Sequence, residues 1–244
     1  MNKANHILSA ACLSLALSLS SCTTESAESP PPPSSDSQGG LSSSVIEAQS
    51  SSSSLVPSSS SVLPSSGSGG GTSGTFTDGR DGQTYKTVEI GDQTWMAENL
   101  NYNASGSVCY DNSASNCDTY GRLYNWSTAL SACPSGWHLP SDSEWDVLTD
   151  FVGSNAGTKL KATSGWAAYS GISNLDTYGF SAIPGGYGRS DGSFNNVGAL
   201  GYWWSATELD ASYAWNRDIS YYNEYVFRND NDKSHLFSAR CLRD

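Results

Sequence analysis

The stretch from residue 23 to residue 74 lacks the aromatic and basic residues from which hydrophobic cores and basic surfaces are built. Of the 244 residues, those from 23 to 74 include 21 serines and no aromatic residue, lysine or arginine. Such a segment cannot bury enough apolar surface to offset its conformational entropy. We therefore predict a disordered Ser/Pro/Gly-rich tether over residues 22–74, with a reach of about 40 Å as a flexible coil. One folded domain is expected over residues 75–244, where all 8 tryptophans, 13 tyrosines and 6 phenylalanines lie.

Basic residues are scarce in the expected domain as well. Residues 75–244 carry 11 Lys and Arg against 20 Asp and Glu, and the whole chain has a formal net charge of −12. An anionic surface repels phosphates, and the sequence has no stripe of Lys and Arg interleaved with aromatic residues. The composition therefore excludes nucleic acid as a partner, and we interpret the acidity as a solubility feature.

The apolar run at the amino terminus is too short to span a bilayer. Met1-Asn2-Lys3 and the apolar residues Ile7–Leu19 are typical of a signal peptide, which we predict over residues 1–21. Leu19-Ser20-Ser21-Cys22 resembles the lipobox of bacterial lipoproteins, so Cys22 is expected to carry the lipid. Ordinary cleavage that leaves Cys22 as a free thiol is the alternative. With a lipid on Cys22, acyl chains would anchor the protein to the bacterial envelope, at the outer membrane or cell surface. No other contact with the membrane is expected.

Closely spaced cysteine pairs such as C-x-x-C are missing, which argues against a thiolate metal site. Four cysteines follow Cys22, an even number that is typical of disulfides in an oxidising compartment. Three pairings are possible. We favour Cys109 with Cys117, which closes a small Asn/Ser loop, and Cys133 with Cys241, which joins the middle of the domain to its last strand.

Two helices are expected in the first half of the domain. Apolar residues at helical spacing predict the first helix over Tyr120–Leu130, with Pro134 beyond its end. Ser141 stands three residues before Glu144, as in a capping box, and therefore marks the start of a second helix. Gly153 is the expected end of this helix.

Strands are expected at both ends of the domain. Two β-rich runs flank Gly91-Asp92 and predict a hairpin with a type II′ turn. Further strands are expected over residues 179–183, 202–207, 213–221, 225–228 and 235–242. Tyr221–Glu224 and Asn229–Asp232 are predicted to be turns, and the oxygen atoms of the second could also bind calcium. Two helices packed on antiparallel strands form an α+β domain.

Three motifs in a fixed order carry a family resemblance: Ile90–Leu100 (IGDQTWMAENL), Cys133–Trp145 (CPSGWHLPSDSEW) and Ser238–Asp244 (SARCLRD). From about Asp78 to its end the chain resembles the Fibrobacter succinogenes major paralogous domain. This resemblance implies a secreted or lipid-anchored bacterial protein and implies no particular activity.

A more remote resemblance concerns the fold. Leu139–Trp145, Trp203–Thr207 and Arg240-Cys241 are similar to segments of the formylglycine-generating-enzyme branch of the C-type-lectin-like fold. The resemblance implies a C-type-lectin-like domain but not the activity, because enzymes of that branch use a close cysteine pair with copper or a histidine cluster with iron. Neither set is present in this sequence.

Candidate catalytic residues are few. His138 and His235 are the only histidines of the expected domain, and we interpret both as structural. No G-x-S-x-G motif surrounds a serine. A glycosidase needs two carboxylates, for which the sequence offers Glu144, Asp146, Glu208, Asp218 and Glu224. Because helix capping already explains Glu144 and sequence spacing cannot test such a pair, we expect no catalytic residue, no metal and no cofactor.

Calcium-dependent lectins provide a partial match. Trp215-Asn216-Arg217-Asp218 is similar to their Trp-Asn-Asp triplet, but Arg217 interrupts it and the Glu-Pro-Asn partner motif is missing. The lectin sugar site therefore does not carry over to this chain.

Aromatic residues near Gly-rich loops are the remaining candidates for ligand contact: Tyr187, Phe194, Tyr202, Trp203 and Trp204. Exposed rings of this kind stack on sugar faces or anchor a protein partner. Our hypothesis is a non-catalytic surface module that binds an extracellular glycan or a surface protein. The alternatives are an enzyme of unrecognised mechanism acting on polysaccharide and a structural envelope protein.

Overall fold

The computed structural model describes residues 72–244. The predicted signal peptide, Cys22 and the predicted tether up to residue 71 lie outside the described residues. The first strand, β1 (Ser73–Thr77), begins two residues before the predicted boundary at residue 75. Ser73 pairs with Val88 of the next strand, so the domain boundary lies earlier than the composition indicates. Strand pairing uses backbone groups, which a Ser/Gly segment also has.

Two five-stranded sheets and a two-stranded ribbon make up the β structure. The first sheet has the order β1, β2 (Thr84–Ile90), β3 (Gln93–Met96), β12 (Leu242–Arg243) and β5 (Trp137–His138). The second has the order β10 (Val226–Asp232), β9 (Tyr213–Ser220), β8 (Leu200–Glu208), β11 (Phe237–Ser238) and β4 (Leu123–Tyr124). The ribbon pairs β6 (Tyr187–Gly188) with β7 (Phe194–Asn195).

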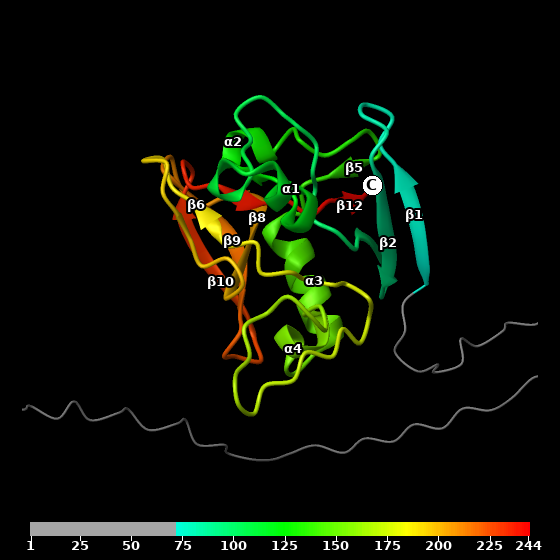
Figure 1. The fold of residues 1–244 in the computed structure, drawn as a ribbon. Coiled ribbons are helices and arrows are strands. Elements are labelled where there is room, and N and C mark those ends of the chain that lie inside the picture. Colours follow the sequence, from blue (N-terminus) through cyan, green and yellow to red (C-terminus); the bar gives the residue numbers. More distant parts are fainter. Residues whose placement is uncertain (1–71) are drawn as a thin grey trace, which may run out of the picture. The chain divides into compact units, whose positions relative to one another are not determined.

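The helices are short and lie between and beside the sheets. They are a 3-10 turn at Tyr110–Asn112 and the α-helices α1 (Ala114–Tyr120), α2 (Trp126–Ala129), α3 (Asp142–Val152) and α4 (Ala156–Leu160). In Figure 1, α3 lies between the long strands β8 to β10 and the β1–β2 pair. Its Trp145 and Leu148 pack with Trp95 of the first sheet and Trp203 of the second in one buried cluster. The predicted α+β class is therefore confirmed.

The predicted hairpin is present as β2 and β3, joined through the pair Ile90 and Gln93. Gly91 has a φ of +60°, whereas Asp92 is not among the residues with positive φ. This combination is the one that a type II′ turn requires. Leu242 of the last strand pairs with Trp95, so strands from both ends of the domain meet in one sheet, as predicted.

The second predicted helix is confirmed as α3. The Ser141 hydroxyl accepts the backbone N–H of Glu144, and the Glu144 carboxylate accepts the backbone N–H of Ser141 at 2.7 Å. These two bonds complete the capping box, and Gly153 caps the carboxyl-terminal end.

The first predicted helix, Tyr120–Leu130, is wrong. Tyr120 is the last residue of α1, and Leu123–Tyr124 form β4, which pairs with β11. The side chain of Asn125 then accepts the backbone N–H of Thr128 and starts the short helix α2. Tertiary strand pairing and an internal capping residue thus override the helical spacing of the apolar side chains.

Three predictions in the second half also need correction. The single strand expected over residues 235–242 is divided into β11 and β12, which belong to different sheets. Residues 179–183 form no strand, and only Ala182 makes an isolated bridge, to Lys161. Asn229–Asp232 is not a turn, because all four residues belong to β10 and pair with β9. The hairpin turn at Tyr221–Glu224 is confirmed, since it joins β9 to β10.

Both favoured disulfides, Cys109–Cys117 and Cys133–Cys241, are present. Within residues 72–244, no helix is both long and apolar enough to cross a membrane.

His138 links the carboxyl terminus to α3. Its Nδ1 lies 2.7 Å from the Asp244 carboxylate and its Nε2 lies 3.0 Å from the Glu144 carboxylate. Burial lowers the pKa of His138, but the hydrogen bonds to Asp244 and Glu144 outweigh this effect and raise the pKa above its ordinary value. The structure therefore agrees with a structural role for this histidine.

Protonation of His138 should make the stability of the domain pH-dependent. Because the pKa is higher in the folded chain, this contribution is fully present below the unfolded value of about 6.5 and is lost as pH rises through the folded value. We expect the loss to stay below about 1 kcal/mol, since all three side chains are partly exposed. Urea unfolding of wild type and His138→Gln at several pH values measures it. An unchanged difference between the two proteins across this range would contradict the assignment.

Candidate functional site

Two of the five aromatic candidates belong to the core. Trp203 and Trp204 are 1% and 0% exposed. Their indole N–H groups donate at 2.8 Å to Asn99 Oδ1 and to the carbonyl oxygen of Tyr124. The prediction that these two rings contact a ligand is therefore wrong, because buried and internally hydrogen-bonded rings have no free face.

Two other candidates meet in a surface hollow. Tyr187 and Tyr202 lie with their ring centroids 5.2 Å apart in an edge-to-face arrangement. Tyr202 also stacks on Phe237 at 4.9 Å, and Tyr187 lies 5.9 Å from the ring of His235. The cavity has a volume of about 160 Å³ and is lined by Tyr187, Arg189, Tyr202, Asn231, His235 and Phe237. We call it the tyrosine hollow.

The fifth candidate, Phe194, lies beside the hollow and does not line it. Its ring packs on Tyr110 at 5.3 Å, and its strand β7 pairs with Tyr187–Gly188. Phe194 therefore supports the strand that carries Tyr187.

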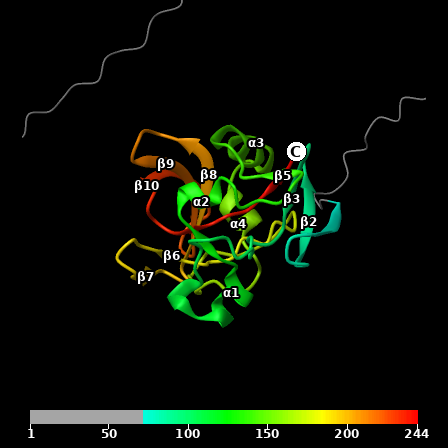
Figure 2. The same ribbon diagram turned by 90° about the horizontal axis from the view of Figure 1, so that it is seen from above.

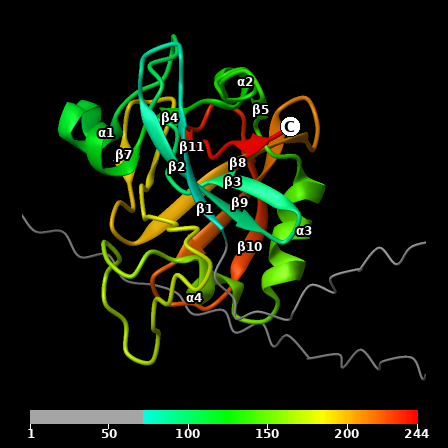
Figure 3. The ribbon, with the colours of Figure 1, turned by 90° about the vertical axis from the view of Figure 1, so that its right-hand side faces the viewer.

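Close backbone approach positions Tyr187. Gly186 has a φ of +64°, and a Cβ atom there would lie 2.5 Å from the carbonyl oxygen of Asn195. Only glycine permits this contact, so the Gly-rich run before Tyr187 lets β6 approach the segment after β7. The ribbon of β6 and β7 lies away from α3, as Figures 2 and 3 show.

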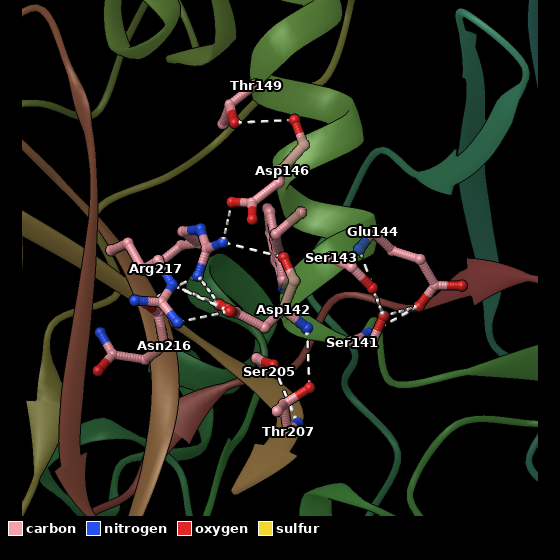
Figure 4. A network of polar contacts seen from close by, with 12 residues as sticks. Ser141, Asp142, Ser143, Glu144, Asp146, Thr149, Ser205, Thr207, Asn216 and Arg217 are labelled. Atoms are coloured by element: carbon pink, nitrogen blue, oxygen red, sulfur yellow. Dashed lines mark hydrogen bonds and ion pairs between the residues drawn. The ribbon is translucent and has the colours of Figure 1, made fainter. Parts of the chain in front are cut away.

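Strand alternation sorts the side chains of β9 onto two faces. Arg217 and Ile219 point toward α3 and the core, whereas Asn216, Asp218 and Ser220 occupy the other face. Figure 4 shows Arg217 directed to Asp142 and Asp146, and Asn216 directed elsewhere. Sequence reasoning missed this polar face, although the alternation of residues 216 to 220 is its signal.

Arg217, which interrupts the lectin-like triplet, has a structural role. It is 2% exposed, and its Nη2 lies 2.6 Å from Asp146 Oδ1 (Figure 4). Asp142 accepts from both Arg217 and Arg228. Burial raises the pKa of Asp142, but the hydrogen bonds from Arg228 and Arg217 outweigh it and lower the pKa. This network holds the start of α3 against β9. Asp146, one of the possible glycosidase carboxylates, is already in an ion pair with Arg217.

Unpaired polar atoms gather on the face that includes the hollow. Within residues 72–244, five buried side-chain atoms have no hydrogen-bond partner, and three of them are His235 Nδ1, Asn216 Nδ2 and Ser220 Oγ. Asn231 donates to Asn216 Oδ1 at 2.8 Å, which connects the hollow to this row. Buried polar groups are normally paired, so three unpaired atoms set this region apart from the rest of the interior. Asn216 and Ser220 are 0% and 2% exposed, so these two side chains lie beneath the surface of the hollow.

Two titratable groups of the hollow, Tyr202 and His235, favour their neutral forms. Burial raises the pKa of Tyr202 to about 12, and the nearby charge of Asp218 adds to this effect. Burial lowers the pKa of His235 below its ordinary value. At neutral pH the hollow therefore presents an uncharged phenol and an uncharged imidazole. Arg189 lies at the rim, where it donates to the Tyr187 hydroxyl at 2.8 Å.

Asp218 lies opposite Tyr202 in the sheet register. Burial raises its pKa, partly offset by a hydrogen bond that Asn229 Nδ2 donates at 2.6 Å. The carboxyl group can therefore serve as a hydrogen-bond partner for a hydroxyl-rich ligand next to the hollow.

The residues considered for calcium do not gather around a point. Asn229–Asp232 lie along β10, so successive side chains point to opposite faces. Within residues 72–244, no group of three or more His, Cys, Asp or Glu side chains is placed to hold a metal ion.

A second cavity, of about 240 Å³, lies between β2, α1 and residues 97–101. Lys86, Glu98 and Asp118 are among its lining residues, and Tyr85 is its one aromatic side chain. Because Tyr85 is buried and hydrogen-bonded to the backbone N–H of Asn101, it offers no free ring. The tyrosine hollow is therefore the stronger candidate for ligand binding.

Comparison with known families identifies the chain. The model of the Fibrobacter succinogenes major domain matches residues 88–243, which include the first two motifs noted in the sequence and all of the third except Asp244. Comparisons with curated proteins and with solved structures found no match. Because the family model covers well over half of the chain, the chain belongs to the Fibrobacter succinogenes major domain family.

Proposed function

We propose that the chain is a non-catalytic binding module that holds an extracellular glycan in the tyrosine hollow. The observation that carries the proposal is the pair of half-buried tyrosine rings that line one surface hollow together with Asn231 and His235. Sugars present apolar C–H faces and many hydroxyl groups. Aromatic side chains match the faces, while Asn231 and His235, which line the hollow, match the hydroxyl groups.

The proposal includes a C-type-lectin-like fold. The three segments that resemble this fold meet in the core, which supports the assignment. Asn99 Oδ1 accepts from Trp203 Nε1 and from Arg240 Nη2, both at 2.8 Å. Trp145 Nε1 donates to the carbonyl oxygen of Trp204 and so brings α3 to the same cluster.

The proposal also includes display at the cell surface. A signal peptide over residues 1–21, a lipid on Cys22 and a Ser-rich tether would hold the domain outward from the bacterial envelope. The two disulfides support an oxidising location outside the cytoplasm. We expect Cys22→Ser to abolish metabolic labelling with radioactive palmitate and to move the protein out of the membrane fraction. Equal labelling of the variant would refute the lipid site.

Glycan binding can be tested on the full chain with an array of polysaccharides and surface glycans. We expect Tyr202→Ala to lower the affinity for the bound glycan by about tenfold or more, as truncation of a central aromatic contact does. Tyr213→Ala is the matched control, because Tyr213 is an exposed tyrosine that does not line the hollow and, by strand alternation, lies on the opposite face of β9 from Asp218. Absence of binding to every glycan by the wild type, or equal affinity of Tyr202→Ala and wild type, would overturn the proposal.

A further inference from the structure

Three tyrosines form a second aromatic surface. The turn between β9 and β10 and the loop after α4 carry them, and both segments lie at the end of the domain where α4 lies (Figure 1). Tyr221 and Tyr222 belong to the turn between β9 and β10, and Tyr169 belongs to the loop after α4. The Tyr169 ring lies 5.7 Å from that of Tyr221 and 6.2 Å from that of Tyr222, and the last two lie 5.2 Å apart. Tyr169 and Tyr222 are 52% and 50% exposed. We call these residues the tyrosine triad.

A buried lysine holds the turn of the triad in place. Lys161 is 0% exposed, and its Nζ donates to the carbonyl oxygens of Ser220 at 3.0 Å and Asn223 at 2.8 Å. These two residues flank Tyr221 and Tyr222. Burying an ammonium group is unfavourable, and burial lowers the pKa of Lys161 to about 8. The unfavourable free energy of burying this ammonium group is therefore found where the lysine holds the backbone of the turn that carries Tyr221 and Tyr222.

Hydrogen bonds also hold the loop that carries Tyr169, the third ring of the triad. Trp166 Nε1 donates to the carbonyl oxygen of Ala182 at 2.9 Å, and Lys161 Nζ lies 5.5 Å from the Trp166 ring. The backbone N–H of Ala167 donates to the carbonyl oxygen of Gly198 at 2.7 Å. The rings are therefore ordered before any ligand arrives, which lowers the entropy lost on binding.

The triad is continuous with the tyrosine hollow. The Tyr221 N–H donates to the carbonyl oxygen of Ala199, next to Leu200 at the start of β8. Leu200 pairs with Ser220, and its carbonyl oxygen accepts from Gly186 beside Tyr187. Along β9, Asp218 opposite Tyr202 is followed two residues later by Ser220, a distance of about 7 Å. The row of Tyr202, Asp218 and Ser220 therefore leads from the hollow to the turn that carries Tyr222, with Ser220 itself buried beneath the surface.

The loop that carries Tyr169 is almost uncharged, whereas the turn of Tyr221 and Tyr222 includes Glu224. Residues 162–178 contain one charged side chain, Asp176, and many Ser, Thr, Gly and Ala residues. The Asp176 carboxylate is already occupied, since it accepts the Ser181 N–H at 2.8 Å and the Ser181 hydroxyl at 2.6 Å. Neutral rings and hydroxyl groups suit a neutral sugar chain better than a charged peptide or an anionic lipid surface.

We infer that the tyrosine triad is a second sugar subsite and that the ligand is a neutral polysaccharide chain long enough to reach both surfaces. The inference rests on the proposed function, because it extends the same face. A chain that occupies both subsites gains affinity by keeping the second contact at high effective concentration. Affinity should therefore rise steeply with chain length until both subsites are filled.

The test uses the full chain, a panel of neutral polysaccharides (cellulose, xylan, chitin, mannan and laminarin) and size-fractionated oligosaccharides from each. We expect the double variant Tyr169→Ala/Tyr222→Ala to bind the polysaccharide about tenfold or more weakly and to bind short oligosaccharides as the wild type does. Tyr202→Ala should weaken both, and Tyr213→Ala neither. Because both triad positions are half exposed, the double variant should remain folded, which circular dichroism checks.

Other outcomes would contradict one or both proposals. If the double variant binds the polymer as tightly as the wild type while Tyr202→Ala does not, the second subsite is refuted and the proposed function stands. Equal weakening for short and long chains also refutes a separate subsite. Absence of wild-type binding to the whole panel and to the wider glycan array overturns both proposals.

Discussion

Replacing Cys133 and Cys241 with alanine is expected to lower the free energy of unfolding by about 4 to 5 kcal/mol. The disulfide joins residues 108 positions apart, so its removal frees a long loop in the unfolded chain. It also ties the segment before β5 to the segment before β12, and Cys241 is 0% exposed. Alanine is preferable to serine because a hydroxyl at this buried position would need a new hydrogen-bond partner. Urea unfolding of the oxidised wild type and the double variant measures the change.

The second disulfide provides the control. Cys109–Cys117 has a sequence separation of 8, so the double alanine variant at these positions should lose less than about 3 kcal/mol. If both double variants lose the same stability, loop entropy does not explain the effect of the longer loop. Strain or packing in the folded state would then determine how much each disulfide stabilises the domain.

Local signals in the sequence are sufficient for the features that depend on a few adjacent residues. The β2–β3 hairpin needs a glycine with positive φ at the turn, and Gly91 satisfies this requirement. The start of α3 needs Ser141 and Glu144 at capping-box spacing, and both hydrogen bonds are present. Such features are predictable because the residues that stabilise them are neighbours in the chain.

Features that depend on distant partners are not predictable in this way. The apolar spacing of residues 120–130 fits a helix, but Leu123–Tyr124 pair with β11, more than 100 residues later. Asn229–Asp232 has the composition of a turn, yet β9 supplies backbone partners for all four residues. In both places, long-range backbone pairing outweighs the local preference of the side chains.

The candidate site likewise combines residues that the local sequence suggests with residues that only the fold brings together. Proximity to glycines led to the choice of Tyr187 and Tyr202, but it also led to the choice of Trp203 and Trp204, which are buried, so this pattern does not separate surface rings from core rings. His235 and Asn231 reach the hollow from strands and turns that only the fold brings together. The run Tyr202-Trp203-Trp204 looks uniform in the sequence, whereas a single strand gives its three rings different environments.

Trp204→Ala is expected to destabilise the domain by about 3 to 5 kcal/mol, the usual range for removing a large buried aromatic side chain. Trp204 is 0% exposed, its ring lies 4.3 Å from Phe237, and its indole N–H donates to the carbonyl oxygen of Tyr124. The variant would leave a cavity under the hollow and an unpaired carbonyl oxygen.

Tyr202→Ala, two residues earlier on the same face of β8, should behave in the opposite way. Tyr202 is partly exposed, so its truncation should change stability much less than that of Trp204 while removing a ligand contact. Thermal unfolding and glycan binding, measured at a temperature where both variants remain folded, separate the two effects. A stable Trp204→Ala variant with lost binding would mean that the ligand reaches Trp204, and the division of this strand into core and binding residues would then be wrong.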